Sequence, residues 1–167
     1  WFNIVRLVAI GIIAHDIDGV VRDGFPVPVR RWIEAPVSVG DLDGDGSLEI
    51  VAVDESGLLY AWRDDGSLVD GFPTDLVNSG RPAAVTGDLD GDGDDELLIG
   101  SPVASNTLLG EARLYLGGPG GPDVTPIQVW TGEEPTGRLG THLGPAGDVN
   151  CDGYGDMIIG SGTGRVD

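Results

Sequence analysis

Residues 40–46 read Gly-Asp-Leu-Asp-Gly-Asp-Gly, and the same seven residues return at 87–93, 47 positions later. A looser copy, Gly-Asp-Val-Asn-Cys-Asp-Gly, follows at 147–153. The flanking sequence keeps the same spacing, because Asp-Gly-Val-Val-Arg-Asp-Gly-Phe-Pro at 18–26 returns as Asp-Gly-Ser-Leu-Val-Asp-Gly-Phe-Pro at 65–73. Internal repeats with a period of about 20 to 50 residues are typical of solenoids, propellers and repeat arrays. The fold is therefore expected to consist of repeated units.

Short apolar runs follow the acidic segments. Each run has four to six residues, is bounded by Gly, Asp or Ser, and lacks the 3.6-residue spacing of an amphipathic helix. The runs lie at 50–53, 57–62, 97–100, 112–116 and 157–160. They predict short strands and no substantial helix. A further run at 4–15 aligns with 51–62, so we expect it to be the strand pair of an earlier unit.

Units of 47 to 60 residues with about four short antiparallel strands match the blades of a β-propeller, in which ring closure removes exposed sheet edges. The predicted fold class is therefore all-β, a partial propeller over residues 1–167. The approximate blades are 1–35, 36–82, 83–142 and an incomplete 143–167. Because a ring needs about four to eight blades, three to three and a half indicate a piece of a longer protein or a part-ring that closes by association.

The acidic segments have the spacing of calcium loops. Oxygen-bearing residues occupy alternate positions, and a glycine at position six allows a sharp turn. Position seven can offer its backbone carbonyl whatever its side chain. The predicted ligands, at positions one, three, five, seven and nine, are Asp41, Asp43, Asp45, Ser47 and Glu49; Asp88, Asp90, Asp92, Asp94 and Glu96; and Asp148, Asn150, Asp152, Tyr154 and Asp156. This pattern predicts three Ca²⁺ sites.

Electrostatics favours a cation in each loop. Two carboxylates about 4 Å apart repel by roughly 4 kcal/mol at an effective dielectric constant of about 20. Magnesium is less suitable because it keeps a strict octahedral geometry, and zinc or copper prefer His and Cys ligands. An EF-hand needs a bidentate Glu at position twelve, which is Ala52, Ile99 or Ile159 here. The alternative is a set of plain Asp-Gly turns, which three copies with matching flanks disfavour.

Composition excludes several other functions. The formal net charge is −19 and all nine basic residues are Arg, so nucleic acid is not an expected partner. The only cysteine, Cys151, rules out an internal disulfide framework. No apolar run has the roughly 18 to 20 residues that a membrane span needs. His15 and His142 lack the neighbours of a nucleophilic triad, so we expect no enzyme activity and no catalytic residue.

The three acidic segments, together with Gly100-Ser101-Pro102, resemble the FG-GAP (VCBS-type) repeats of integrin α-subunit propellers and of many surface proteins. The resemblance implies a seven-bladed propeller with calcium in hairpin loops on one rim, acting in adhesion or ligand binding. Some positions depart from the family pattern. Leu139-Gly140 stands where the family has Phe-Gly, and Cys151 replaces the usual Gly at position four. We expect the Cys151 side chain to point away from the metal.

The sequence and this resemblance together predict a non-catalytic, secreted or cell-surface calcium module that binds a protein or carbohydrate ligand. Weak calcium sites, with Kd values of about 0.1 to 1 mM, would be filled only outside the cytosol. Two alternatives remain open: a structural protein that joins its open blade edges into a ring or fibre, and the accessory propeller of a polysaccharide-degrading enzyme. The aromatic residues Trp32, Tyr60, Trp62 and Trp130 could form a carbohydrate platform, but we expect them to pack between blades.

Overall fold

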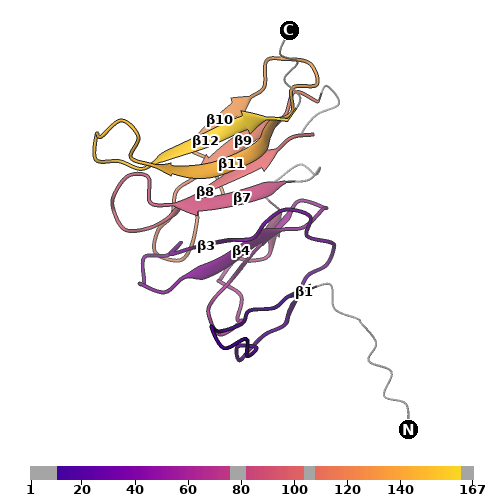
Figure 1. Cartoon of the computed structure of the whole chain (residues 1–167), viewed down its shortest axis with the longest axis vertical. Coiled ribbons are helices and arrows are strands. Elements are labelled where there is room, and N and C mark those ends of the chain that lie inside the picture. The colour runs from indigo at the N-terminus through magenta and orange to yellow at the C-terminus, as the bar shows by residue number, and fades with distance from the viewer. Residues whose placement is uncertain (1–10, 76–81, 104–107, 163–167) are drawn as a thin grey trace.

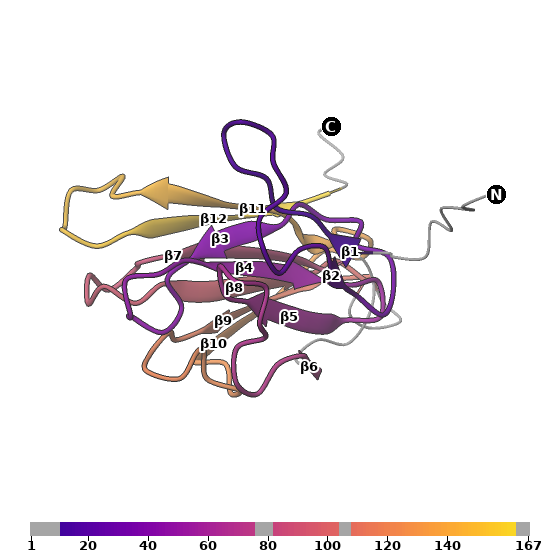
Figure 2. The same ribbon diagram turned by 90° about the horizontal axis from the view of Figure 1, so that it is seen from below.

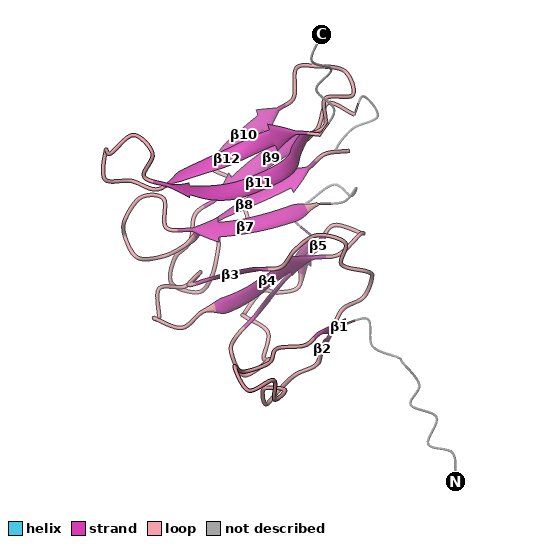
Figure 3. Cartoon of the chain, in the orientation of Figure 1, coloured by secondary structure: helices cyan, strands magenta, loops and turns pink. Residues whose placement is uncertain are grey.

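The computed structural model describes residues 11–75, 82–103 and 108–162. All regular secondary structure in these residues is β-strand, and Figure 3 shows no helix among them. Within the same residues, no helix is long and apolar enough to span a lipid bilayer. The all-β prediction is therefore confirmed for the described chain. Most of the strand pair predicted at 4–15 lies outside the described residues.

Two four-stranded sheets form the centre of the molecule. The first contains β3 (Ser38–Gly40), β4 (Glu49–Val53), β5 (Leu58–Trp62) and β6 (Thr74–Asp75). The second contains β7 (Ala83–Gly87), β8 (Glu96–Ser101), β9 (Glu111–Tyr115) and β10 (Gln128–Thr131). Strands that follow each other in sequence pair antiparallel in both sheets. A four-stranded antiparallel sheet of this kind is the unit of a β-propeller blade.

A two-stranded sheet lies on each side of this pair. One joins β1 (Gly11–Ile12) to β2 (Val27–Pro28), and the other joins β11 (Leu139–Gly147) to β12 (Asp156–Ser161). Figure 1 shows the sheets stacked like a fan from the N-terminal to the C-terminal end. This arrangement is consistent with successive propeller blades. Closure into a ring and the exact blade boundaries stay predictions.

Apolar side chains fill the spaces between neighbouring sheets. One buried cluster includes Leu42, Val51, Leu59, Leu97 and Ile99, and so joins the two four-stranded sheets. A second cluster joins the first of these sheets to the β1–β2 pair; it contains Phe25, Val27, Ala52, Tyr60 and Trp62. Burial of these apolar faces is the main force that holds the sheets together.

The strands β3, β7 and β11 lie side by side and line a shared groove. The Ser38 and Thr86 hydroxyl groups are 2.9 Å apart, and the Thr86 amide donates to Ser38 Oγ, so polar contacts join β3 to β7. The first hairpins, β3–β4, β7–β8 and β11–β12, all place their connecting loops on the same side of the molecule (Figures 1 and 2). The three acidic segments are those loops.

The prediction that four aromatic residues pack between blades is right for two of them. Tyr60 and Trp62 are buried in the cluster between the first sheet and the β1–β2 pair, and their rings stack at 5.0 Å with planes 8° apart. Trp32 and Trp130 are exposed, so the prediction that they pack between blades is wrong. Trp130 lies on β10, the outermost strand of its sheet, where all four residues are exposed.

Candidate metal sites

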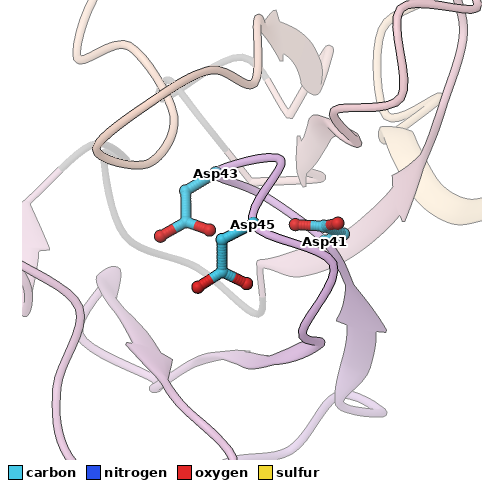
Figure 4. Close-up of side chains that lie close together, drawn as sticks. All are labelled: Asp41, Asp43 and Asp45. Atoms are coloured by element: carbon cyan, nitrogen blue, oxygen red, sulfur yellow. The ribbon is translucent and has the colours of Figure 1, made fainter.

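The loop between β3 and β4 gathers three carboxylates. One oxygen from each of Asp41, Asp43 and Asp45 lies within 4.8 Å of the others, and Figure 4 shows the three side chains projecting from a single turn. Asp41 Oδ1 and Asp43 Oδ1 are buried and have no hydrogen-bond partner. An ionised oxygen in that position is costly without a positive partner. The donor set and these two orphaned oxygens fit a hard cation such as Ca²⁺.

Backbone amides hold the first loop in its curled shape. The Gly46 amide donates to Asp41 Oδ2 at 2.9 Å, and the Ser47 amide donates to Asp45 Oδ1 at 2.7 Å. Gly44 and Gly46 have positive φ values of 68° and 85°. A side chain is strained in that backbone region, which explains the glycines at positions four and six.

The loop between β7 and β8 gathers a different trio. Asp88, Asp90 and Glu96 each place an oxygen within 4.8 Å of the other two. Asp92 lies outside this trio, although it accepts a hydrogen bond from the Asp94 amide at 2.9 Å, as Asp45 does from the Ser47 amide in the first loop. Asp88 and Asp90 are exposed, unlike the partly buried Asp41 and Asp43. The first two loops therefore share a sequence pattern but differ in solvent access.

The loop between β11 and β12 is the most exposed. Asp148, Asn150 and Asp152 are all open to solvent, and the Asn150 amide group donates to Asp152 Oδ2 at 2.9 Å. Asp148 accepts from the Gly153 amide, as Asp41 accepts from Gly46 in the first loop. Cys151 is exposed and has a φ of 62°, close to the 68° of Gly44 at the same position. The turn is thus preserved although its glycine is replaced.

The acid at position nine has the same role in all three loops. Glu49, Glu96 and Asp156 each accept the backbone amide of position two, at 2.9, 2.7 and 2.8 Å. The contact closes each loop at its base. The sequence pattern gave no indication of this contact.

Burial shifts the pKa values of two of these acids. Burial raises the pKa of Glu49, the hydrogen bond from the Leu42 amide lowers it, and the nearby Asp43 carboxylate raises it again. Burial likewise raises the pKa of Glu96, against the hydrogen bond from Leu89. A cation would offset both the burial and the repulsion by favouring the ionised form.

The second loop also contacts the first. The Asp41 amide donates to Asp95 Oδ2 at 3.0 Å, and the Asp95 amide donates to the Asp41 carbonyl at 2.6 Å. A β-carbon added at Gly44 would overlap the Asp94 carboxylate, so this side chain lies against the first loop. Burial raises the pKa of Asp94, and the carboxylates of Asp92, Asp41 and Asp43 raise it further.

The predicted ligands are thus brought together in part. The structure clusters Asp41, Asp43 and Asp45 in one loop and Asp88, Asp90 and Glu96 in another. Metal binding stays a prediction for these six residues and for the other nine predicted ligands: Ser47, Glu49, Asp92, Asp94, Asp148, Asn150, Asp152, Tyr154 and Asp156. Asp95 was not among the predicted residues, although the Asp94-Asp95 doublet falls inside the second acidic segment.

Comparison with protein families agrees with these repeats. Residues 31–99 match the FG-GAP-like repeat, and residues 81–120 match the FG-GAP repeat. The chain is also 39% identical over 85 residues to integrin alpha-IIb of Mus musculus. That alignment covers 42% of this chain but only 8% of the mouse protein.

Proposed function

Because this chain is an FG-GAP repeat protein with integrin-like repeats, we propose that it is a calcium-binding, non-catalytic propeller module. The main support is the first acidic loop. It places three carboxylates together and buries two of their oxygens without a hydrogen-bond partner. Without a cation these oxygens would lack any compensation for their lost hydration.

We further propose that the acidic loops hold calcium to stiffen the hairpins. Asp41, Asp43 and Asp45 would bind the ion in the first loop, and Asp88, Asp90 and Glu96 in the second. The third loop would use Asp148, Asn150 and Asp152 with weaker affinity, because its exposed side chains leave water to compete for the ion. Bound Ca²⁺ would neutralise the repulsion among the carboxylates and fix each loop in one conformation.

The biological role proposed for the module is ligand binding outside the cell or at its surface. Integrin-like FG-GAP repeats are typically non-catalytic, and the similarity to an integrin α-subunit favours a protein ligand. Calcium sites with Kd values of about 0.1 to 1 mM are typical of extracellular modules. The stacked sheets would form one sector of a seven-bladed ring, with the acidic loops on one rim.

Direct calcium titration tests the proposal. The chain, freed of metal by chelation and dialysis, is titrated with CaCl₂ by isothermal calorimetry, with MgCl₂ as the competing cation. We expect saturable calcium binding with a Kd near or below about 1 mM and much weaker magnesium binding. The variant Asp41→Asn should lose one site. Absence of saturable calcium binding at 10 mM would contradict the proposed function.

A further inference from the structure

We infer that Asp95 is a positioning residue for the first calcium site: from the neighbouring sheet it fixes the backbone of Asp41, and so keeps the Asp41 carboxylate in place for the ion. The inference rests on the proposed calcium binding and adds to it a residue that would not touch the ion. Asp95 lies directly before β8, at position eight of the second loop, which is not a ligand position in the predicted pattern. Its effect on calcium would therefore be exerted through Asp41.

Asp95 binds both backbone groups of Asp41. The Asp41 amide donates to Asp95 Oδ2 at 3.0 Å, and the Asp95 amide donates to the Asp41 carbonyl at 2.6 Å. Both residues are partly buried, so water competes less well for these hydrogen bonds than it would at an exposed site. Because the two bonds lie on either side of the Asp41 α-carbon, together they fix the direction in which the Asp41 side chain leaves the backbone.

The side chain of Asp41 needs such support. Asp41 Oδ2 accepts the Gly46 amide at 2.9 Å, whereas Asp41 Oδ1 is buried without a hydrogen-bond partner. An unpartnered carboxylate oxygen is driven to turn toward water, because its lost hydration is costly. Asp95 holds the main chain and Gly46 holds the side chain against that rotation. Asp41 thus stays beside Asp43 and Asp45, with one oxygen of each residue within 4.8 Å of the others.

Neighbouring contacts hold the rest of the loop's first residues. The Leu42 carbonyl accepts the Gly118 amide at 3.0 Å, from the connection after β9, and the Leu42 amide donates to Glu49 at 2.9 Å. Gly40 approaches Asp95 so closely that an added β-carbon would overlap Asp95 Oδ2. The start of the first loop is therefore held between its own hairpin and the second sheet, and Asp95 provides the side-chain part of that contact.

The third loop gives the second loop a backbone contact in place of this side-chain contact. Position eight of the third loop is Gly155, whose amide donates to the Leu89 carbonyl at 3.1 Å. A β-carbon added at Gly87, the residue before the second loop, would meet nothing closer than 3.8 Å. Asp88 and Asp90 in this loop are exposed. The first loop thus has a positioning side chain where the second has main chain alone.

The first and third loops fold without a carboxylate at position eight. The first loop has Leu48 there, which is 56% exposed, and the third has Gly155. Removal of the Asp95 side chain should therefore leave the second loop folded. Burial raises the pKa of Asp95, whereas the Asp41 amide and, to a smaller extent, the Asp88 amide lower it. The carboxylate thus also lies near its own loop, so a smaller effect is expected there.

Site-resolved NMR on the whole chain tests this inference. The glycine amides at position six, Gly46, Gly93 and Gly153, report calcium binding in each loop separately. Calcium titrations would compare the wild-type chain with Asp95→Ala, which cannot accept the Asp41 amide, and with Asp95→Asn, whose side-chain oxygen still can. Asp95→Gly repeats the test with the residue that the third loop carries at this position, in case the Ala variant folds poorly.

We expect Asp95→Ala and Asp95→Gly to weaken calcium binding at the Gly46 probe by at least about tenfold and at Gly93 by less than about threefold. Residues that orient a metal ligand without touching the metal typically contribute about tenfold or more to affinity. Asp95→Asn should stay within about threefold of wild type at both probes. The control is Leu48→Ala, which changes position eight of the first loop itself and should alter each site by less than about twofold.

Three results would overturn the inference. They are unchanged binding at Gly46 in the Ala and Gly variants, weakening at Gly93 as large as at Gly46, and equal weakening at Gly46 by Ala and Asn, which would assign the effect to charge. A wild-type chain without calcium-dependent shifts at any probe would instead contradict the proposed function itself.

Hydrogen exchange of the Asp41 amide in chelator tests the positioning contact without calcium. We expect exchange to be at least about fivefold faster in Asp95→Ala than in the wild type, and to change less than about twofold in Asp95→Asn, because the Ala variant leaves this amide without its acceptor. Equal exchange rates in the wild type and the Ala variant would show that Asp95 does not hold Asp41.

Discussion

Gly100 and Gly140 meet backbone to backbone where the second four-stranded sheet contacts the β11–β12 pair. A β-carbon on Gly100 would overlap the Gly140 carbonyl oxygen, and one on Gly140 would lie 2.9 Å from the Gly100 Cα. Gly100 begins the Gly-Ser-Pro segment and Gly140 belongs to Leu-Gly, the two segments that resemble the family motif. The repeated glycines therefore let the backbones of neighbouring blades approach closely.

Gly100→Ala should destabilise the chain by about 1 to 3 kcal/mol, because the added methyl group has only backbone to displace. The control is Gly144→Ala on β11, where an added β-carbon meets nothing within 4 Å. That change should alter stability by less than about 0.5 kcal/mol. Urea unfolding monitored by tryptophan fluorescence measures both, and equal losses would argue against close packing as the reason for Gly100.

Cys151→Gly should stabilise the third loop. Cys151 has a φ of 62°, a backbone conformation that costs a residue with a side chain about 1 kcal/mol relative to glycine. Glycines, Gly44 and Gly91, occupy the same position in the other two loops. We expect the free energy of unfolding, measured by thermal unfolding, to rise by about 1 kcal/mol. Cys151→Ser, which keeps the β-carbon, should give no gain. A gain of the same size in both would point to the thiol rather than the backbone.

Asp43→Asn should have opposite effects with and without calcium. In calcium-free buffer the change removes repulsion from the first loop and a buried, unpartnered charge, so stability should rise by about 1 kcal/mol. In 10 mM calcium the variant loses a ligand and should be less stable than wild type by about 1 to 3 kcal/mol. The exposed Asp123 serves as control, and Asp123→Asn should show no such reversal. Destabilisation in both buffers would mean that Asp43 is structural only.

The pH dependence of thermal stability should have opposite signs with and without calcium. Burial raises the pKa of Glu49 and Glu96 above 4.5, and that of Asp95 above 3.8. Such acids bind a proton more tightly in the folded chain than in the unfolded one. Protonation of these acids therefore favours the folded chain. This contribution to stability is complete below the ordinary pKa values and is lost as pH rises through the raised pKa values.

Lowering the pH from about 7.5 to about 5 should therefore raise the Tm in calcium-free buffer and lower it in calcium, because protons compete with the ion for the carboxylates. Differential scanning calorimetry across this range, with and without calcium, measures both slopes. Slopes of the same sign would contradict the proposed competition.

Much of the fold could be predicted because the repeats and the strand runs are local features. The runs after each acidic segment became β4, β8 and β12, and Gly46, Gly93 and Gly153 have the positive φ values that a sharp turn needs. The exposure of Trp130 could not be predicted, since the sequence does not reveal which strand is outermost in a sheet. The contact of Asp94 with Gly44 joins residues 50 positions apart and depends on how the two blades stack.

Thermal unfolding with and without calcium is the most direct measurement of the central claim. The chain would be heated in 10 mM CaCl₂, and in chelator with MgCl₂ at matched ionic strength. Filling each site with calcium should raise the free energy of unfolding by about 1 to 3 kcal/mol. We therefore expect the Tm in calcium to be at least about 5 °C higher than in chelator. Superimposable unfolding curves would show that the clustered carboxylates keep their shape without calcium, and would contradict the claim.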